Sequence, residues 1–291
     1  MTIPYNDFFN GWKTGLKNIL TIDLEDWYQS ILTISPFHWG QYEKRIWQGT
    51  NKLLEMMAKT RAKATFFILG KVASEHGGLV RLIASRGHEI GSHGYCHRPV
   101  YEQTESAFSK DLEKSIKILE DITGKKVKGY RAPWFSITKK TLWALDILSA
   151  HGIEYDASIF PVRTGFYGIS KAPRHPYKIK TKHKAIIEIP PATLKLCKAV
   201  IPIGGGFYLR MLPCNLIRYG IRKLNRNNIP AVIYIHPWEL DLKQPRLSPG
   251  FIQGLIHYTN IEKAEFKFAK LMSDFRFGPV KDALPLLTGI R

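Results

Sequence analysis

The segment 18–26 reads NILTIDLED, an apolar run that ends in three acidic side chains. Continuous apolar runs of this length are typical of strands that are buried on both faces of a parallel sheet. Asp23, Glu25 and Asp26 fall where this strand ends. Because the carboxyl ends of parallel strands form the ligand-binding rim of α/β proteins, the segment predicts both a central strand and part of a site.

Short apolar strands alternate with helical stretches along the rest of the chain. We expect further strands over 63–69, 88–91, 126–130, 185–189 and 231–235, and helices over 42–60, 72–85, 102–122, 138–150 and 213–227. This alternation predicts a parallel sheet with helical cover, either a barrel or an open sheet. We expect one domain over 1–291, with a basic insertion near 161–185 and a helical extension from about 240.

The amino-acid composition limits the class of protein to which the chain can belong. The chain has 291 residues, of which 44% are hydrophobic and 23% charged, as in ordinary globular proteins. It has no apolar run of about 18 residues, so no spanning helix is expected. Residues 1–17 lack the pattern of a secretory signal, and the three cysteines are widely spaced. Both features favour a reducing compartment, and we expect a cytoplasmic protein.

The formal net charge is +19, and part of this excess is concentrated in one segment. Between 163 and 198, nine lysines and arginines are opposed by Glu188 alone. Strongly basic surfaces favour polyanions, but no zinc-finger spacing or RNA-binding aromatic motif is present, so we expect no nucleic acid. The alternatives are a solvated basic face, an acidic glycan partner, or an anionic membrane surface that would make the protein peripheral to the inner membrane.

Two histidines stand in the segment 90–97, IGSHGYCH, directly after an expected strand. If the segment were helical, one turn would place His93 and His97 on the same face, as two nitrogen ligands of one divalent metal. Arg131, Asp156 and His236 also follow expected strands. Each has an ordinary alternative as a cap, an ion-pair partner or a turn residue. Together they predict a polar site on one rim of the sheet.

Five segments resemble, in order, the motifs of the polysaccharide deacetylases with a NodB-homology domain, carbohydrate esterase family 4. They are TIDLED (21–26), SHGYCH (92–97), RAPW (131–134), YD (155–156) and IH (235–236). The resemblance extends over about 19–236 and includes GHEIGSH (87–93) and ATFF (64–67). DLEDWY (23–28), GGGFYLR (204–210) and HPWE (236–239) are similar to a subgroup linked to bacterial exopolysaccharide assembly.

The resemblance implies a fold and an activity. The fold would be a distorted or incomplete (β/α) barrel with about seven parallel strands and outer helices. The activity would be metal-dependent removal of N-acetyl groups from a polysaccharide or a lipid-linked glycan, in exopolysaccharide or cell-wall biosynthesis. The alternatives are a related metal-dependent amidase that acts on a non-sugar linear or cyclic amide, and a non-catalytic module that binds glycan or membrane.

The first motif departs from the family, in which two aspartates are adjacent and serve as base and metal ligand. Here Leu24 separates Asp23 from the next acid, Glu25. Side chains two apart on an extended segment point the same way, so we assign Asp23 as base and Glu25 as ligand, with Asp26 as the alternative ligand. With His93 and His97, the ligand set would suit Zn²⁺ best.

The other roles follow from the resemblance. Arg131 would orient Asp23, and His236 would protonate the departing amine with Asp156 holding its imidazole. The fourth motif lacks the usual tryptophan and has Phe160 near that place.

Aromatic side chains would complete the site. The backbone N–H of Trp134 would stabilise the oxyanion, and Trp134, Tyr208 and Trp238 are candidates for a wall that contacts a sugar ring.

Overall fold

The protein is described by a computed structural model that covers residues 17–31, 33–165 and 167–288. The predicted absence of a secretory signal concerns residues that lie almost entirely outside this range. Among the described residues, no helix is long and apolar enough to cross a membrane.

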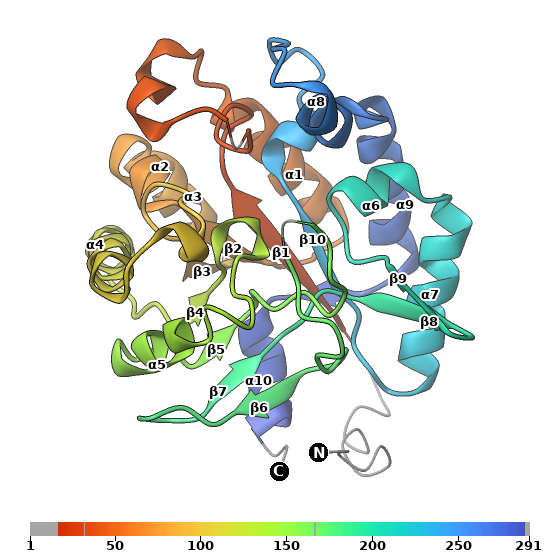
Figure 1. Ribbon diagram of the computed structural model, residues 1–291. Helices are drawn as coiled ribbons and strands as arrows, with labels where there is room; N and C mark the ends of the chain where they lie inside the picture. Colours follow the sequence, from red (N-terminus) through yellow and green to blue (C-terminus); the bar gives the residue numbers. More distant parts are fainter. Residues whose placement is uncertain (1–16, 32, 166, 289–291) are drawn as a thin grey trace.

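One nine-stranded sheet forms the centre of the molecule (Figure 1). Seven strands follow one another in parallel, in the order β10–β1–β2–β3–β4–β5–β7. Their bounds are β10 Val232–Ile235, β1 Asn18–Leu24, β2 Thr65–Ile68, β3 Glu89–Ser92, β4 Gly129–Tyr130, β5 Tyr155–Asp156 and β7 Ile186–Glu188. Strand β6 (Tyr177–Ile179) adds an antiparallel edge, and the short strand β11 (Phe277–Gly278) pairs with β1 in parallel. The main path thus has the predicted number of about seven parallel strands, and β11 adds one more.

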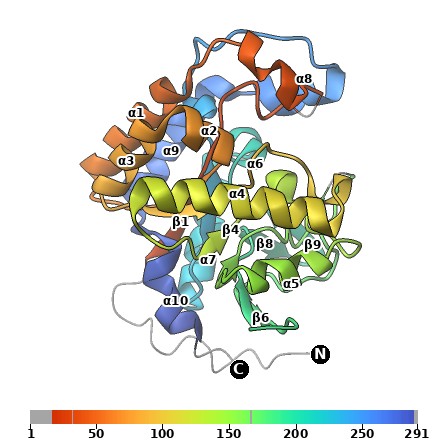
Figure 2. The same ribbon diagram turned by 90° about the vertical axis from the view of Figure 1, so that its left-hand side faces the viewer.

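Most helices pack on the outer side of this sheet, whereas α10 (Val280–Thr288) packs against its inward-facing side, where Val280 and Leu287 join a buried cluster with Ile19 of β1 (Figures 1 and 2). The other helices are α1 Ile46–Lys59, α2 Gly70–Glu75, α3 Gly77–Ser85, α4 Glu105–Thr123, α5 Trp143–Ala150, α6 Phe207–Met211, α7 Cys214–Arg226, α8 Phe251–Tyr258 and α9 Ala264–Asp274. A separate hairpin is formed by β8 (Thr193–Leu196) and β9 (Ala199–Pro202). The predicted helix over 72–85 is therefore two helices, α2 and α3, which meet at His76.

The barrel is closed by single hydrogen bonds instead of a continuous ladder. These bonds form along the edge of β10 that does not pair with β1. The Ala192 N–H donates to the Val232 carbonyl at 2.9 Å, and the Tyr234 N–H donates to the Gly204 carbonyl at 2.6 Å. Gly205 lies so close to Tyr234 that a Cβ there would be 1.8 Å from the Tyr234 carbonyl oxygen. The fold is thus the distorted barrel that the sequence predicted.

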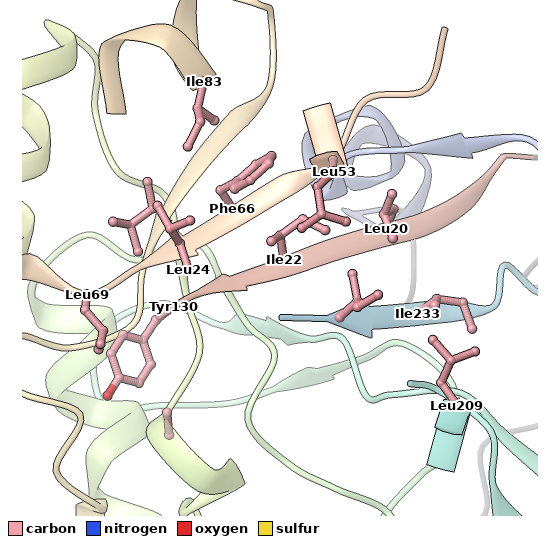
Figure 3. Close-up of a cluster of buried hydrophobic side chains, with 14 of the residues drawn as sticks. Leu20, Ile22, Leu24, Leu53, Phe66, Leu69, Ile83, Tyr130, Leu209 and Ile233 are labelled. Carbon is pink, nitrogen blue, oxygen red and sulfur yellow. The ribbon is translucent and has the colours of Figure 1, made fainter. Parts of the chain in front are cut away.

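Strand β1 sends alternate side chains to opposite faces of the sheet. Leu20, Ile22 and Leu24 face outward, where they join the helices in one buried cluster with Leu53 of α1 and Phe66 of β2 (Figure 3). The other face turns into the barrel and carries polar groups toward the end of the strand. This alternation places Asp23 inside the rim while its neighbours hold the helices.

Helix α1 packs closely on the segment that follows β10. At Gly49 an added Cβ would lie 2.0 Å from the carbonyl oxygen of Pro237, which is a backbone atom. Pro237 directly follows His236, so the packing of α1 fixes the position of a predicted site residue.

We predict that Gly49→Ala destabilises the protein although alanine is the better helix former by about 1 kcal/mol. The steric clash with Pro237 should lower the free energy of unfolding by about 1–3 kcal/mol, measured by denaturant titration. The control is Gly78→Ala in α3, where nothing lies within 4 Å of the new Cβ and the stability should be unchanged or higher. A Gly49→Ala protein as stable as wild type would contradict this packing.

Candidate active site

A cavity of about 120 Å³ opens at the carboxyl end of the parallel strands. Its walls come from the ends of β1, β3, β4 and β10, and from α6 and α8. Asp23, Glu25, His93, His97 and His236 line it together. The structure therefore brings most of the predicted site residues to one place, although they are spread over more than 200 positions in the chain.

Three side chains form a cluster that fits one metal ion. Glu25, His93 and His97 are buried, and one ligand atom from each lies within 4.8 Å of the others. His93 donates from Nδ1 to the backbone carbonyl of Arg131 at 2.8 Å, which leaves its Nε2 for a ligand. His97 Nε2 lies 2.8 Å from Glu25 Oε2.

The histidines meet through a loop and not through the helical turn that their spacing would also allow. The residues after β3 have no helix assignment, and His97 has a left-handed φ of 54°. Asp111 of α4 holds this loop by accepting from the Tyr95 N–H at 2.7 Å. The spacing of His93 and His97 thus reflects a fixed loop geometry.

The donor set fits a divalent cation such as Zn²⁺. Glu25 Oε1 accepts a hydrogen bond from Trp238 Nε1 at 3.1 Å, and the buried Oε2 faces Nε2 of His97. Burial, and then the charge of His97, lower the pKa of His93 well below its usual value, so it is a neutral ligand. Burial alone would raise the pKa of Glu25, but the nearby histidines lower it to about 2, so it is ionised. Imidazole nitrogens and a carboxylate are common zinc ligands.

Asp26, the alternative ligand, lies outside this cluster. Its carboxylate accepts from the backbone N–H groups of Trp27 at 2.9 Å, Arg45 at 2.7 Å and Ile46 at 3.0 Å. It therefore satisfies backbone donors at the start of α1. This also explains why α1 begins at Ile46 and not at residue 42 as expected.

Asp23 forms a buried ion pair with Arg131. Arg131 Nη1 donates to Asp23 Oδ1 at 2.7 Å and to Thr21 Oγ1 at 2.8 Å, while its Nε donates to the carbonyl of Ala157 at 3.0 Å. Neither Asp23 nor Arg131 is more than 2% exposed. The second oxygen of Asp23, Oδ2, lies 3.8 Å from His236 Nε2.

The partner of His236 is Glu239 and not Asp156, so that prediction is wrong. His236 Nδ1 lies 2.9 Å from Glu239 Oε2, and Glu239 Oε1 accepts from Arg210 Nε at 2.7 Å. The sequence signal for Glu239 was the segment HPWE, in which a glutamate three residues after the N-cap residue of a short helix reaches back to that residue. Nε2 of His236 faces Glu25 Oε1 at 3.7 Å.

Asp156 is buried deeper in the sheet, away from the cavity. It accepts from the hydroxyl of Ser158 and neighbours the buried carboxyl of Glu188. Burial raises the pKa of Asp156 to about 6 and that of Glu188 well above its usual value. Ser158 in turn accepts from the Ala132 N–H at 2.7 Å, so this pair supports the chain just after Arg131.

Two of the three predicted aromatic residues line the cavity. Trp134 has a left-handed φ of 58°, and its ring lies 5.8 Å from that of His97. Trp238 stacks between His236 at 5.2 Å and His257 at 4.1 Å. Because Trp238 is 6% exposed, it mainly supports the site, whereas Trp134 is free to contact a ligand.

Tyr208 does not line the cavity. Its hydroxyl lies 3.3 Å from that of Tyr167, which does line it. Tyr167 was not identified from the sequence, since it lies in the glycine-rich insertion where no strand or helix pattern marked its direction.

Two family models match consecutive parts of the chain. The model described as polysaccharide deacetylase matches residues 42–155, and a domain of unknown function, DUF3473, matches 157–285. Residues 42–155 are thus similar to the polysaccharide deacetylases, the family that the sequence motifs resemble.

Curated relatives match over part of their length. A peptidoglycan deacetylase of Helicobacter pylori is 33% identical over 111 residues, which are 38% of this chain and 37% of that protein. A peptidoglycan-N-acetylglucosamine deacetylase of Bacillus cereus is 29% identical over 119 residues, 37% of this chain and 43% of that protein. The matched region spans about two fifths of these relatives.

Solved structures share the fold over nearly the whole chain. A Mycobacterium smegmatis structure described as a polysaccharide deacetylase has a TM-score of 0.62 at 19% identity, covering 97% of this chain and 94% of its own. Puue allantoinase has a TM-score of 0.58 at 12% identity, covering 98% and 97%. At these identities the likeness shows the fold.

We predict that Glu239→Gln lowers the pKa of His236 by at least one unit. Burial lowers this pKa, but the hydrogen bond and charge of Glu239, and then Glu25 and Asp23, raise it to about 9. The pKa of His236 in the folded protein thus exceeds its usual value of 6.5. Protonated His236 therefore stabilises the metal-free protein fully below about pH 6.5, and this stabilisation is lost as the pH rises through 9. The Glu239→Gln protein should lose less stability than the wild type between pH 6.5 and 9. The pKa of His236 in both proteins is measured by NMR titration.

The matched control is Glu188→Gln, which alters another buried carboxyl that does not contact His236. An unchanged pKa of His236 in Glu239→Gln protein would show that Glu239 does not set its protonation.

Proposed function

We propose that the protein is a metal-dependent hydrolase that removes N-acetyl groups from N-acetylated sugars of a polysaccharide or a lipid-linked glycan, in exopolysaccharide or cell-wall biosynthesis. The observation that carries the proposal is the cluster of Glu25, His93 and His97 beside Asp23 and His236 in one cavity. The family match of residues 42–155 and the names of its curated relatives support the choice of an acetamido substrate.

In this proposal Glu25, His93 and His97 hold a Zn²⁺ ion. When bound, the metal supplies Lewis-acid polarisation of the acetyl carbonyl and an acidified water. Hydrogen bonds orient two of these ligands: the carbonyl of Arg131 accepts from the ring of His93, and the indole of Trp238 donates to Glu25.

Asp23 accepts the proton of the attacking water. The ion pair with Arg131 uses only Oδ1 of Asp23, so Oδ2 faces the cavity. The backbone N–H of Trp134 is assigned, from the resemblance, to stabilise the oxyanion that develops on the carbonyl oxygen.

His236 donates a proton to the amine as the C–N bond of the amide breaks, so acetate and a free amino sugar leave. Glu239 orients the ring and favours its protonated form, which is the form that a general acid needs. Arg210 keeps Glu239 ionised and fixed.

The decisive experiment is acetate release from N-acetylglucosamine oligosaccharides and from peptidoglycan. Treatment with a chelator should abolish release, and Zn²⁺ should restore it. Hydrolysis of cyclic amides without acetate release from any glycan would replace the proposal with an amidase function.

Replacing a ligand should separate metal binding from proton transfer. We predict that His93→Ala loses bound metal and activity together, because two ligands cannot hold the ion tightly. His236→Ala should keep the metal and lose activity at least 100-fold. Metal content by mass spectrometry and acetate release measure both, and a His93→Ala protein with normal metal content would refute the ligand assignment.

Asp23→Asn tests the base. The amide keeps the shape of the side chain but cannot accept the proton, so kcat should fall by at least 100-fold while metal is retained. Activity near the wild-type level would remove Asp23 from the role of base.

A further inference from the structure

A second cavity, of about 340 Å³, opens beside the proposed active site. It is lined by residues 138–140, 163–165 and 167–170. These segments follow β4 and β5, which are neighbouring parallel strands of the sheet. Tyr167 lines both cavities, so its side chain forms part of a shared wall.

The second cavity carries three positive charges. Lys139, Lys140 and Arg163 line it and are exposed, and no acidic side chain is among its lining residues. None of the three forms an ion pair with any residue that the structure describes. Unpaired like charges in one concave surface repel each other and create a positive potential that attracts an anion.

The loop that carries Arg163 has a defined turn. The Thr164 N–H donates to the Tyr167 carbonyl at 2.8 Å, and the Tyr167 N–H donates to Thr164 Oγ1 at 3.0 Å. Gly168 has a φ of 94°, and a Cβ there would lie 2.0 Å from the Val162 carbonyl oxygen, so the turn requires glycine. The backbone next to Arg163 is therefore fixed in place beside the shared wall.

We propose that this second cavity binds an anionic group, a carboxylate or a phosphate, on a glycan whose N-acetylated sugar occupies the neighbouring active site. The inference rests on the proposed function. Lysine and arginine are the side chains that bind these groups, and the shared wall at Tyr167 lets one chain of sugars reach both cavities. The preferred substrate is then an acidic N-acetylated glycan.

Binding to a variant that cannot turn over tests the second cavity directly. In an Asp23→Asn background, Lys139→Gln, Lys140→Gln and Arg163→Gln are combined. The matched control combines Lys178→Gln, Lys180→Gln and Lys198→Gln, which remove the same charge from exposed positions outside both cavities.

Three probes are compared by calorimetry. They are a tetrasaccharide of alternating glucuronate and N-acetylglucosamine, an N-acetylglucosamine tetramer with a terminal phosphate, and the neutral tetramer. At least one acidic probe should bind fivefold or more tightly than the neutral one, and the preferred probe identifies carboxylate or phosphate. The ratio of acidic to neutral affinity should fall at least fivefold in the cavity variant and stay within twofold in the control.

Equal affinities for acidic and neutral probes, or equal losses in the two variants, would overturn the anion site. Acetate release by protein with intact Asp23 separates this result from the proposed function. Release from the neutral tetramer without an acidic preference keeps the deacetylase and rejects the anion site. Charge-dependent binding without release from any probe keeps the anion site and rejects the deacetylase.

Discussion

The site depends on one buried guanidinium. Arg131 is fully buried, and its side chain ties β1 to the chain after β5 through Asp23 and Ala157. Its own carbonyl oxygen fixes the ring of His93. An unpaired buried cation would cost several kcal/mol, so Asp23 and Arg131 require each other. A single residue thereby sets the position of the proposed base and of one proposed metal ligand.

The short helix Pro237–Leu240 also fixes the positions of two site residues. Trp238 donates to Glu25, and Glu239 holds His236. Since α1 packs against Pro237, the position of this segment depends on the packing of α1. The proposed ligand and the proposed acid are thus fixed by consecutive residues, and a change in this packing would move both.

The sequence predicted where the polar groups stand but not all of their contacts. Strand ends are readable from apolar runs, which is why Asp23, Arg131 and His236 were found and why the fold was predicted. Contacts made through loops could not be predicted. The left-handed backbone at His97, for example, leaves no periodic pattern of apolar residues in the sequence. The assignment of Asp156 as the partner of His236 failed because the order of the family motifs does not fix which carboxyl reaches the imidazole.

The two matched regions of the chain form one chemical unit. Residues 42–155 contain His93, His97 and Arg131, whereas His236 lies in the region 157–285. Asp23 precedes both regions, on β1. Strand β1 pairs with β2 of the first region and with β10 of the second, so the strand that carries the proposed base joins the two. Neither matched region holds all the polar residues that line the cavity, and His236, the proposed proton donor, comes from the region of unknown function.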